Sequence, residues 1–233
     1  MQEPPEKPKA RELAEQAIIA GAGMIPIAGS PIAVAFAVAM GWSYNKRMRA
    51  WLEDLAAAVN ELQDAQGEAF SIEDLADNDL FTDAIVNATR AAQATHHEEK
   101  LRALRNGVLH SIGPDAPSVD EQARFFRLVE DFTPAHLRLL SFVNDPGVAF
   151  EASGIPKPDL LAGPTFALVE RGMPEFERER DWYNLLAGDL SGARLTNREL
   201  TGMMSEAGLW QPYTSPLGRR FLAFIKGDDP TVI

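Results

Sequence analysis

Histidines are the residues of this sequence with the most versatile chemistry, and two of the four are adjacent, His96 and His97. Adjacent residues on a helix point about 100° apart, so their two imidazoles cannot readily bind one metal ion. Helical zinc pairs lie four residues apart, as in the H-E-x-x-H motif, which this sequence lacks. We therefore expect His96 and His97 to be exposed in the first turn of a helix. The isolated His110 and His136 are interpreted as structural.

Other patterns that would indicate catalysis are also missing. The sequence contains no cysteine, which excludes disulfides, thiolate nucleophiles and thiolate metal sites. Gly21-Ala22-Gly23 follows no recognisable strand and has no later glycine, lysine or acidic residue at the spacing of a nucleotide-binding loop. The carboxylate-rich segment 175–181 is typical of a solvated helix start with ion pairs. We therefore predict a protein that is not an enzyme, with no catalytic residue, no bound metal and no cofactor.

A long apolar segment is the main feature that remains, because the chain carries no charge from Gln16 to Asn45. Such a segment must be hidden from water in a core, a partner or a lipid bilayer. Pro26 and Pro31 divide it into arms of ~14 and ~18 Å, too short to cross a hydrocarbon layer of ~30 Å. We therefore predict an apolar helical hairpin. Its membrane or assembly surface is expected to comprise Ile25, Ile27, Ile32, Ala33, Val34, Phe36, Ala37, Val38, Gly41 and Trp42.

Two interpretations of this hairpin stay open. Ala33, Ala37 and Gly41 recur every four residues and form a small-residue face that lets another helix approach closely. This face fits a hairpin buried in the protein's own core or in a homo-oligomer interface. The uncharged composition also fits association with a membrane, and a cleaved segment is a third alternative.

A long helix is predicted from Pro31 to about Ala65. Its C-terminal half carries apolar residues at alternating spacings of four and three, which is typical of a helix-packing seam. The seam residues are Met48, Leu52, Leu55, Val59 and Leu62. Lys46, Arg47 and Arg49 follow the apolar run directly, and we expect them to contact lipid head groups if the hairpin meets a membrane.

Helix start signals are plentiful along the rest of the chain, and strand signals are few. In four places a hydroxyl residue precedes an acidic residue by three positions, the spacing of a capping box: Ser71–Asp74, Thr95–Glu98, Ser118–Glu121 and Thr196–Glu199. Proline follows a cap residue at Ser30, Thr133 and Ser215, where its missing N–H costs nothing. The sequence predicts an all-α fold with helices over 10–24, 31–65, 72–76, 79–94, 96–111, 119–132, 134–144, 175–190, 197–207 and 216–226.

Two domains are expected. Prolines and glycines predict an irregular stretch over 145–174, with one short helix near 165–170. The first domain, 1–145, would contain the apolar hairpin, the long amphipathic helix and a central helical bundle. In the second domain, 146–233, the predicted helix over 197–207, a short extended crossing and a closing helix over 216–226 resemble a winged-helix module.

The charge of the chain bears on its partners. A formal net charge of −12 disfavours nucleic acid, and the predicted helix over 197–207 sets Glu199 and Glu206 against Arg198 where a DNA-reading helix would present basic and amide groups. The acidic N-terminal residues do not fit a secretory signal. We therefore expect a cytoplasmic protein without a nucleic-acid partner. Its expected partners are a second copy, another protein, or lipid at the periphery of the inner membrane.

Three segments together resemble an uncharacterised group of bacterial helical proteins. They are Ile25-Pro26-Ile27-Ala28-Gly29-Ser30-Pro31, Glu98-Glu99-Lys100-Leu101 followed by Leu104-Arg105-Asn106, and Gly208-Leu209 with Pro216-Leu217-Gly218-Arg219-Arg220-Phe221-Leu222. The chain is also broadly similar to abortive-infection (Abi-alpha-like) proteins, some of which are suspected of acting at membranes. This resemblance implies a role in phage defence and supplies no catalytic residue.

The leading hypothesis is a non-enzymatic effector that associates with membranes or self-assembles, with phage defence as the biology that the resemblance implies. The alternative is a soluble adaptor or scaffold protein whose apolar hairpin is buried in its core or in a homo-oligomer interface.

Overall fold

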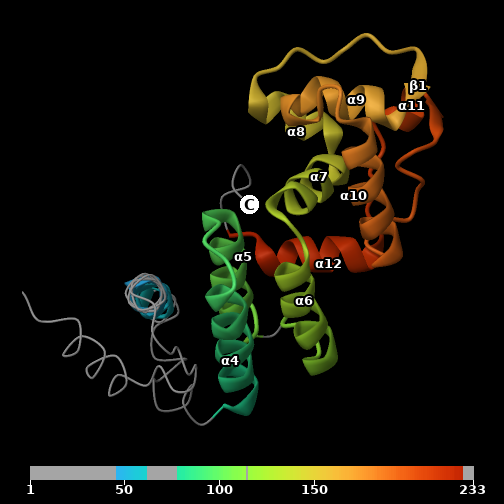
Figure 1. The fold of residues 1–233 in the computed structure, drawn as a ribbon. Coiled ribbons are helices and arrows are strands. Elements are labelled where there is room, and N and C mark those ends of the chain that lie inside the picture. The colour runs from blue at the N-terminus through green and yellow to red at the C-terminus, as the bar shows by residue number, and fades with distance from the viewer. Residues whose placement is uncertain (1–45, 62–77, 114, 228–233) are drawn as a thin grey trace, which may run out of the picture. The chain divides into compact units, whose positions relative to one another are not determined.

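The computed structural model describes residues 46–61, 78–113 and 115–227, and divides the chain into two compact units, Met1–Asp54 and Leu55–Ile233. Most of the described residues are helical (Figure 1), which confirms the prediction of a mainly helical protein. The sheet among them has two strands. A helix over 46–61 comes first. It is followed by α4 (Asp79–Gln93), α5 (Glu98–Leu109), α6 (Val119–Asp131), α7 (Pro134–Asn144), α8 (Pro146–Ser153), β1 (Ala162–Pro164), α9 (Thr165–Gly172), the 3-10 helix η2 (Pro174–Phe176), α10 (Arg180–Gly192), β2 (Met203–Ser205), α11 (Glu206–Leu209) and α12 (Pro216–Ile225).

The helix over 46–61 buries Trp51, Leu55 and Ala58. Their spacing of four and three residues places these side chains on one helix face. Leu52, which we predicted to lie in the seam, is instead 47 % exposed, while the seam residues Met48 and Val59 are half-buried. Spacing alone could not distinguish the predicted seam from the face that is buried, because both have spacings of four and three residues and both include Leu55.

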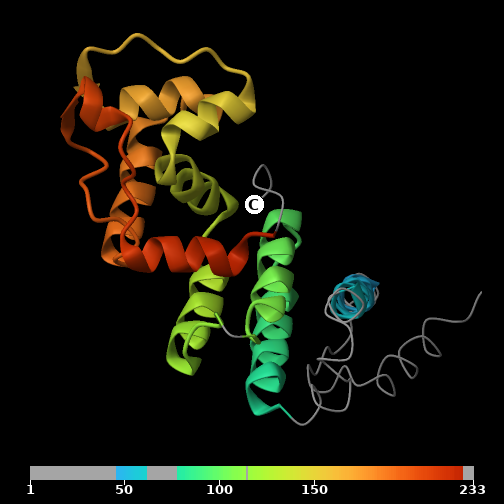
Figure 2. The ribbon, with the colours of Figure 1, turned by 180° about the vertical axis from the view of Figure 1, so that it is seen from behind.

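Phenylalanines dominate the packing of α4, α5, α6 and α12. The first three helices pack against one another, and α12 lies across α5 and α7 (Figures 1 and 2). Phe224 of α12 contacts Phe125 and Phe126 of α6, with ring centroids 5.4 and 5.2 Å apart. Gly107 of α5 lies against these rings, because a Cβ there would come within 2.8 Å of Phe224. The close approach of α5 to α12 therefore requires glycine at this position.

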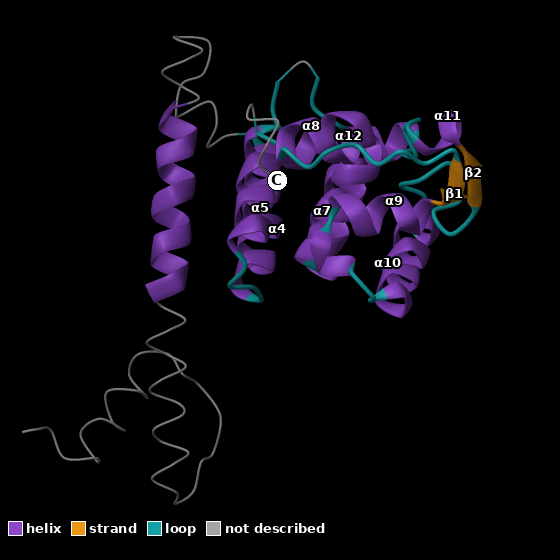
Figure 3. Ribbon diagram, turned by 90° about the horizontal axis from the view of Figure 1, so that it is seen from above, coloured by secondary structure: helices purple, strands orange, loops and turns teal. Residues whose placement is uncertain are grey.

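The remaining core is formed by α7, α8, α9 and α10. Phe150 of α8 contacts Phe142 of α7 and Trp210, with both ring-centroid distances 5.6 Å. Tyr183 of α10 contacts Phe166 of α9 at 5.0 Å. The antiparallel pair of β1 and β2 lies beside α11 (Figure 3), and β1 also contacts α9.

The irregular stretch predicted over 145–174 contains a helix that the sequence analysis missed, α8. The Asp145 side chain caps it by accepting a hydrogen bond from the Val148 N–H at 3.0 Å, and Pro146 occupies the first helical position. Asp-Pro-Gly is therefore a helix start here and not a break. The short helix predicted near 165–170 is present as α9.

The helix predicted over 197–207 is wrong. The Asn197 N–H donates to the Tyr213 carbonyl, the Thr165 N–H donates to the Gly202 carbonyl, and Met203–Ser205 forms β2. Only the four residues of α11 are helical in this region, and Ser205 caps them in place of Thr196. Bonds to distant segments have replaced the local helical bonds, a tertiary effect that propensity does not capture.

Two other helices differ from the prediction. His97 is the N-cap of α5, and the Thr95 hydroxyl accepts from the His97 N–H at 3.2 Å, so the predicted box of Thr95 with Glu98 is not formed. The helix predicted over 175–190 is divided into η2 and α10, because Arg178 has a φ of 65°, in the left-handed region. By contrast, α6, α7 and α12 begin at the predicted residues.

The boundary predicted between residues 145 and 146 lies inside the unit Leu55–Ile233. In this unit α12 contacts α5 and α7, and α7 contacts α8 and α10. Residues from the two sides of the predicted boundary therefore pack together.

Candidate functional site

Most residues of the predicted membrane or assembly surface cannot be placed, because Ile25 to Trp42 lie outside the described residues, as does Leu62 of the seam. Gly21-Ala22-Gly23 lies outside them too. Among the residues that the structure describes, no helix has the length and apolar composition needed to cross a membrane.

The predicted head-group residues are exposed. Lys46, Arg47 and Arg49 lie at the start of the helix over 46–61, with their side chains in solvent. Glu53 and Asp54, which follow on the same helix, are also exposed. The helix therefore changes from basic to acidic along its length, with its basic end next to the apolar run.

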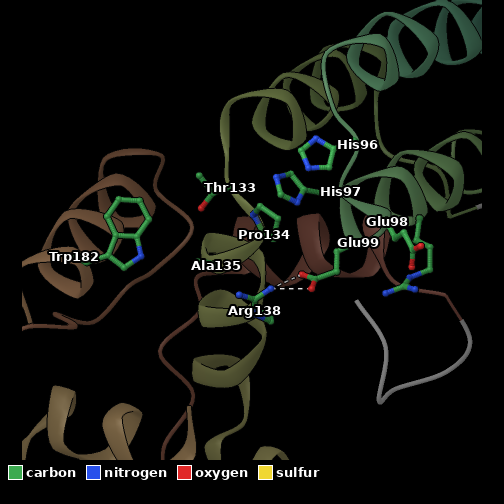
Figure 4. Close-up of a pocket in the computed structure, with 10 residues that line it drawn as sticks. His96, His97, Glu98, Glu99, Thr133, Pro134, Ala135, Arg138 and Trp182 are labelled. Carbon is green, nitrogen blue, oxygen red and sulfur yellow. Dashed lines mark hydrogen bonds and ion pairs between the residues drawn. The ribbon is translucent and has the colours of Figure 1, made fainter. Parts of the chain in front are cut away.

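A pocket of about 600 Å³ lies where the first turns of α5 and α7 face α10 (Figure 4). Its lining combines imidazoles, carboxylates, guanidinium groups and one indole: His96, His97, Glu98, Glu99, Arg102, Thr133, Pro134, Ala135, Arg138 and Trp182.

The two adjacent histidines belong to this pocket. They lie before α5 and not in its first turn, and their rings stack with centroids 4.3 Å apart. The angular argument against a shared metal therefore does not apply to them, although both side chains are exposed as expected. Among the described residues, no group of three or more histidine, cysteine or acidic side chains is arranged to hold a metal ion.

Arg138 of α7, which lines the pocket, forms ion pairs with α5 and η2. Its Nη1 donates to both carboxylate oxygens of Glu99 at 2.8 Å, and its Nε donates to Glu175 at 3.0 Å. Partial burial lowers the pKa of Arg138, but the hydrogen bond to Glu175 and the attraction of Glu99 outweigh it and raise the pKa above its usual value. Glu175, from the carboxylate-rich segment, thus ties α7 to η2.

A buried histidine, His136, links α7 to α10. Its Nδ1 lies 3.1 Å from the backbone N of Thr133 and its Nε2 lies 3.1 Å from Oδ2 of Asp189, while its ring stacks on Phe132. Burial lowers the pKa of His136, Asp189 opposes this shift, and the nearby Lys100 adds to it.

Lys100 is a buried cation near this junction. Its Nζ donates to the backbone carbonyl of Glu130 at 2.7 Å, at the C-terminal end of α6. Burial lowers the pKa of Lys100, and the charges of Glu130 and Asp131 oppose the shift. A cation at a helix C-terminus is stabilised by the exposed carbonyl groups there.

The outer face of α10 exposes large apolar side chains. Trp182 is 39 % exposed and Leu185 is 53 % exposed, three residues apart on one face. Trp182 also forms one wall of the pocket, opposite the histidines (Figure 4).

His136 was interpreted as structural, and the structure places it in the capping box of α7 and against Asp189 of α10. Thr133-Pro134-Ala135-His136 places an imidazole at the third helical position, where a capping box usually has Glu or Gln. The histidine at this position could be seen in the sequence. Its pairing with Asp189 could not, because Asp189 is distant in the chain.

Comparisons of the chain with protein-family models, with curated proteins and with solved structures found no match. The similarity to abortive-infection proteins therefore stays a prediction based on the three sequence segments.

Proposed function

We propose that this protein is a non-enzymatic effector that associates with membranes through the apolar run over 16–45, with the start of the helix over 46–61 at the lipid head groups. The observation that carries this proposal is the order of charges along the chain. An uncharged run is followed by three exposed basic residues and then by exposed acidic residues.

This order matches the electrostatics of an anionic membrane surface. Each basic residue near such a surface contributes about 1 kcal/mol of attraction, which falls off within a Debye length. Along a helix, Glu53 lies ~6 Å beyond Arg49 and Glu61 lies ~18 Å beyond it, at ~1.5 Å per residue. The basic residues would therefore contact the head groups, while Glu61 would lie beyond the Debye length and Glu53, still within it, would offset part of the attraction.

The resemblance to Abi-alpha-like proteins extends the proposal to phage defence. We expect bacteria that express the chain to lower the plating efficiency of a sensitive phage, and the Ala37→Glu variant, with a charge in the apolar run, to restore it. Equal plating with both chains would argue against this extension.

Flotation of the purified full-length chain with anionic liposomes tests membrane association. The wild-type chain is expected to float, and Ala37→Glu is expected to abolish flotation. The double variant Arg47→Glu/Arg49→Glu removes at least about 2 kcal/mol of attraction, which lowers partitioning by roughly thirtyfold or more.

The control is Arg171→Glu/Arg178→Glu, which changes the net charge equally at two exposed arginines of the C-terminal region. It should float like the wild type. If Ala37→Glu floats as well as the wild type, the membrane proposal is wrong.

A second candidate function, binding of a protein partner as an adaptor, is favoured by the exposed Trp182 and Leu185 on α10. Exposed aromatic and apolar side chains are typical of the centres of protein interfaces. If the chain is an adaptor, the apolar run would be buried in its core or between two copies. The wild-type chain would then stay unbound to liposomes and sediment as a defined oligomer without detergent.

The winged-helix-like module belongs to this second candidate, but its predicted helix over 197–207 is absent. A different set of elements, β1, α9, α10 and β2, with the two strands antiparallel, supports a module of this kind. In this order α10 occupies the place of the second helix of a helix-turn-helix unit. Its exposed Asp181 and Asp189 favour a protein over DNA as its partner. Sedimentation of Trp182→Ser/Leu185→Ser, with Leu161→Ser as the exposed apolar control, tests whether this face forms the contact between copies.

A further inference from the structure

We propose that Thr133, His136 and Asp189 form a proton-sensitive clamp between α7 and α10, and that protonation of His136 releases the first turn of α7 and changes the adjoining pocket. The clamp is independent of the proposed membrane association, because its three residues lie in the unit Leu55–Ile233, away in the chain from the apolar run and the basic residues.

The protonation state of the clamp follows from its donors. A backbone N–H always donates, so Nδ1 of His136, 3.1 Å from the Thr133 nitrogen, must be an acceptor without a proton. The neutral imidazole then carries its proton on Nε2, which donates to Oδ2 of Asp189 at 3.1 Å. The neutral His136 ring thus accepts from the backbone N–H of Thr133 at the start of α7 and at the same time donates to Asp189 of α10.

Protonation breaks this arrangement at one end only. A second proton on His136 must occupy Nδ1, where it faces the Thr133 N–H as donor against donor. The Thr133 Oγ1, 2.9 Å away, can accept the new N–H, but the backbone N–H of Thr133 then loses its partner. We therefore expect the first turn of α7 to rearrange while the bond to Asp189 strengthens.

The charges around the ring agree with this assignment. Asp189 faces it from α10 and Lys100 from α5, and the Lys100 ammonium is itself close to Glu130 and Asp131 at the end of α6. Phe132 covers the ring, and Phe221 of α12 contacts Phe132 with ring centroids 6.5 Å apart. Burial lowers the pKa of His136 and outweighs the carboxylate of Asp189, so the imidazole is neutral near pH 7 and gains its proton on acidification.

The clamp connects two walls of the pocket. Thr133, Pro134 and Ala135 form the wall from α7, and Trp182 forms the wall from α10, about two helical turns before Asp189. A change in the first turn of α7 therefore moves one wall relative to the other. The pocket that any ligand or partner would meet depends on the protonation of His136.

An NMR titration of the full-length chain from pH 8 to pH 5, a range of roughly 1.5 units on either side of an ordinary histidine pKa, tests this inference. The His136 ring resonance is expected to titrate with a midpoint below the 6.5 of a free imidazole. The Thr133 amide and the Trp182 indole N–H resonances should shift with the same midpoint, because all three report one event.

Three variants sharpen the test. His136→Gln keeps a side-chain oxygen that can accept from the Thr133 N–H but has no proton to gain, so the Thr133 and Trp182 shifts should vanish. Asp189→Asn removes the carboxylate that raises the His136 pKa, so the common midpoint should move to lower pH. His97→Gln is the matched control, because it changes a pocket histidine outside the clamp and should leave the Thr133 profile unchanged.

The clamp is refuted if Thr133 and Trp182 do not follow the His136 midpoint in the wild-type chain, a result that needs no variant to fold. It is also refuted if the profiles persist in His136→Gln, or if they disappear in His97→Gln.

Discussion

The contact between α6 and α12 and the contact between α7 and α10 are both buried, but they are made of different chemistry. Phe125, Phe126 and Phe224 form the first, with ring centroids 5.2 to 5.4 Å apart. The second contains the hydrogen bond from His136 to Asp189, 3.1 Å long. The apolar contact keeps its energy over a wide pH range, whereas the polar one depends on a proton.

The difference shows where this fold can adjust. Aromatic rings in a close-packed core tolerate neither loss nor gain of volume, so α12 holds α5 and α6 in one arrangement. The clamp residues lie beside the pocket, where a change of one proton alters the hydrogen bonding of a helix start.

The largest effect is expected for Phe224→Ala, which removes a buried ring from the apolar contact. Phe-to-Ala changes in cores cost about 3–5 kcal/mol, because transfer energy is lost and a cavity remains. The free energy of unfolding should fall by that amount at both pH 8 and pH 5, as measured by denaturant titration. Leu161→Ala, at a residue 78 % exposed, is the control and should change stability by less than about 0.5 kcal/mol.

A smaller loss is expected for Gly107→Ala, which adds volume to the same contact. The new Cβ would lie 2.8 Å from Phe224 and 3.0 Å from Phe126, so the rings must move, at a cost of about 1–3 kcal/mol. Gly188→Ala on α10 is the matched control, because nothing lies within 4 Å of its Cβ position. That control should raise the melting temperature, since alanine is the better helix former by up to about 1 kcal/mol. A melting temperature lowered equally in both variants would contradict the proposed role of Gly107.

The polar contact should give the chain a stability that depends on pH. The unfolded imidazole gains its proton near pH 6.5 and the folded His136 at lower pH. The contribution of the neutral ring is therefore complete above pH 6.5 and is lost as the pH falls from 6.5 to the folded pKa. The slope in that window is at most about 1.4 kcal/mol per pH unit. Denaturant titrations of the wild type and His136→Gln should diverge in this window, whereas identical pH profiles would contradict the assignment.

The smallest effect is expected for Arg138→Gln, which removes the ion pairs with Glu99 and Glu175. Both pairs are partly exposed, so screening limits the loss of stability to about 1 kcal/mol at low salt. The loss should shrink further at high salt, unlike the loss for Phe224→Ala. Thermal unfolding at two salt concentrations separates the two cases.

Much of the fold could be predicted because its helix starts are local signals. Ser118, Thr133 and Ser215 are N-caps as predicted, and the prolines after Thr133 and Ser215 occupy first-turn positions. A cap needs only a hydroxyl and the N–H groups within three residues, so the sequence contains the whole interaction.

The candidate site was predicted less well, because its residues come from distant segments. The sequence indicated exposed histidines at 96 and 97, and both side chains are exposed in the structure. It could not bring Trp182 to His97, or Asp189 to His136, since these pairs depend on how α10 packs against α7. The buried face of the helix over 46–61 was misassigned because packing outside the helix, and not spacing within it, decides which of Trp51 and Leu52 is buried.

The sequence by itself determined the mainly helical class, the caps at Ser118, Thr133 and Ser215 and the charge order around the apolar run, because each depends on neighbouring residues. Only the tertiary structure decided that residues 197–202 are not helical and that His136 joins α7 to α10. In the region 197–202, backbone groups bond to segments such as Tyr213 and Thr165 that are remote in the chain. Local preferences amount to tenths of a kcal/mol per residue, and the packing that satisfies buried polar groups outweighs them.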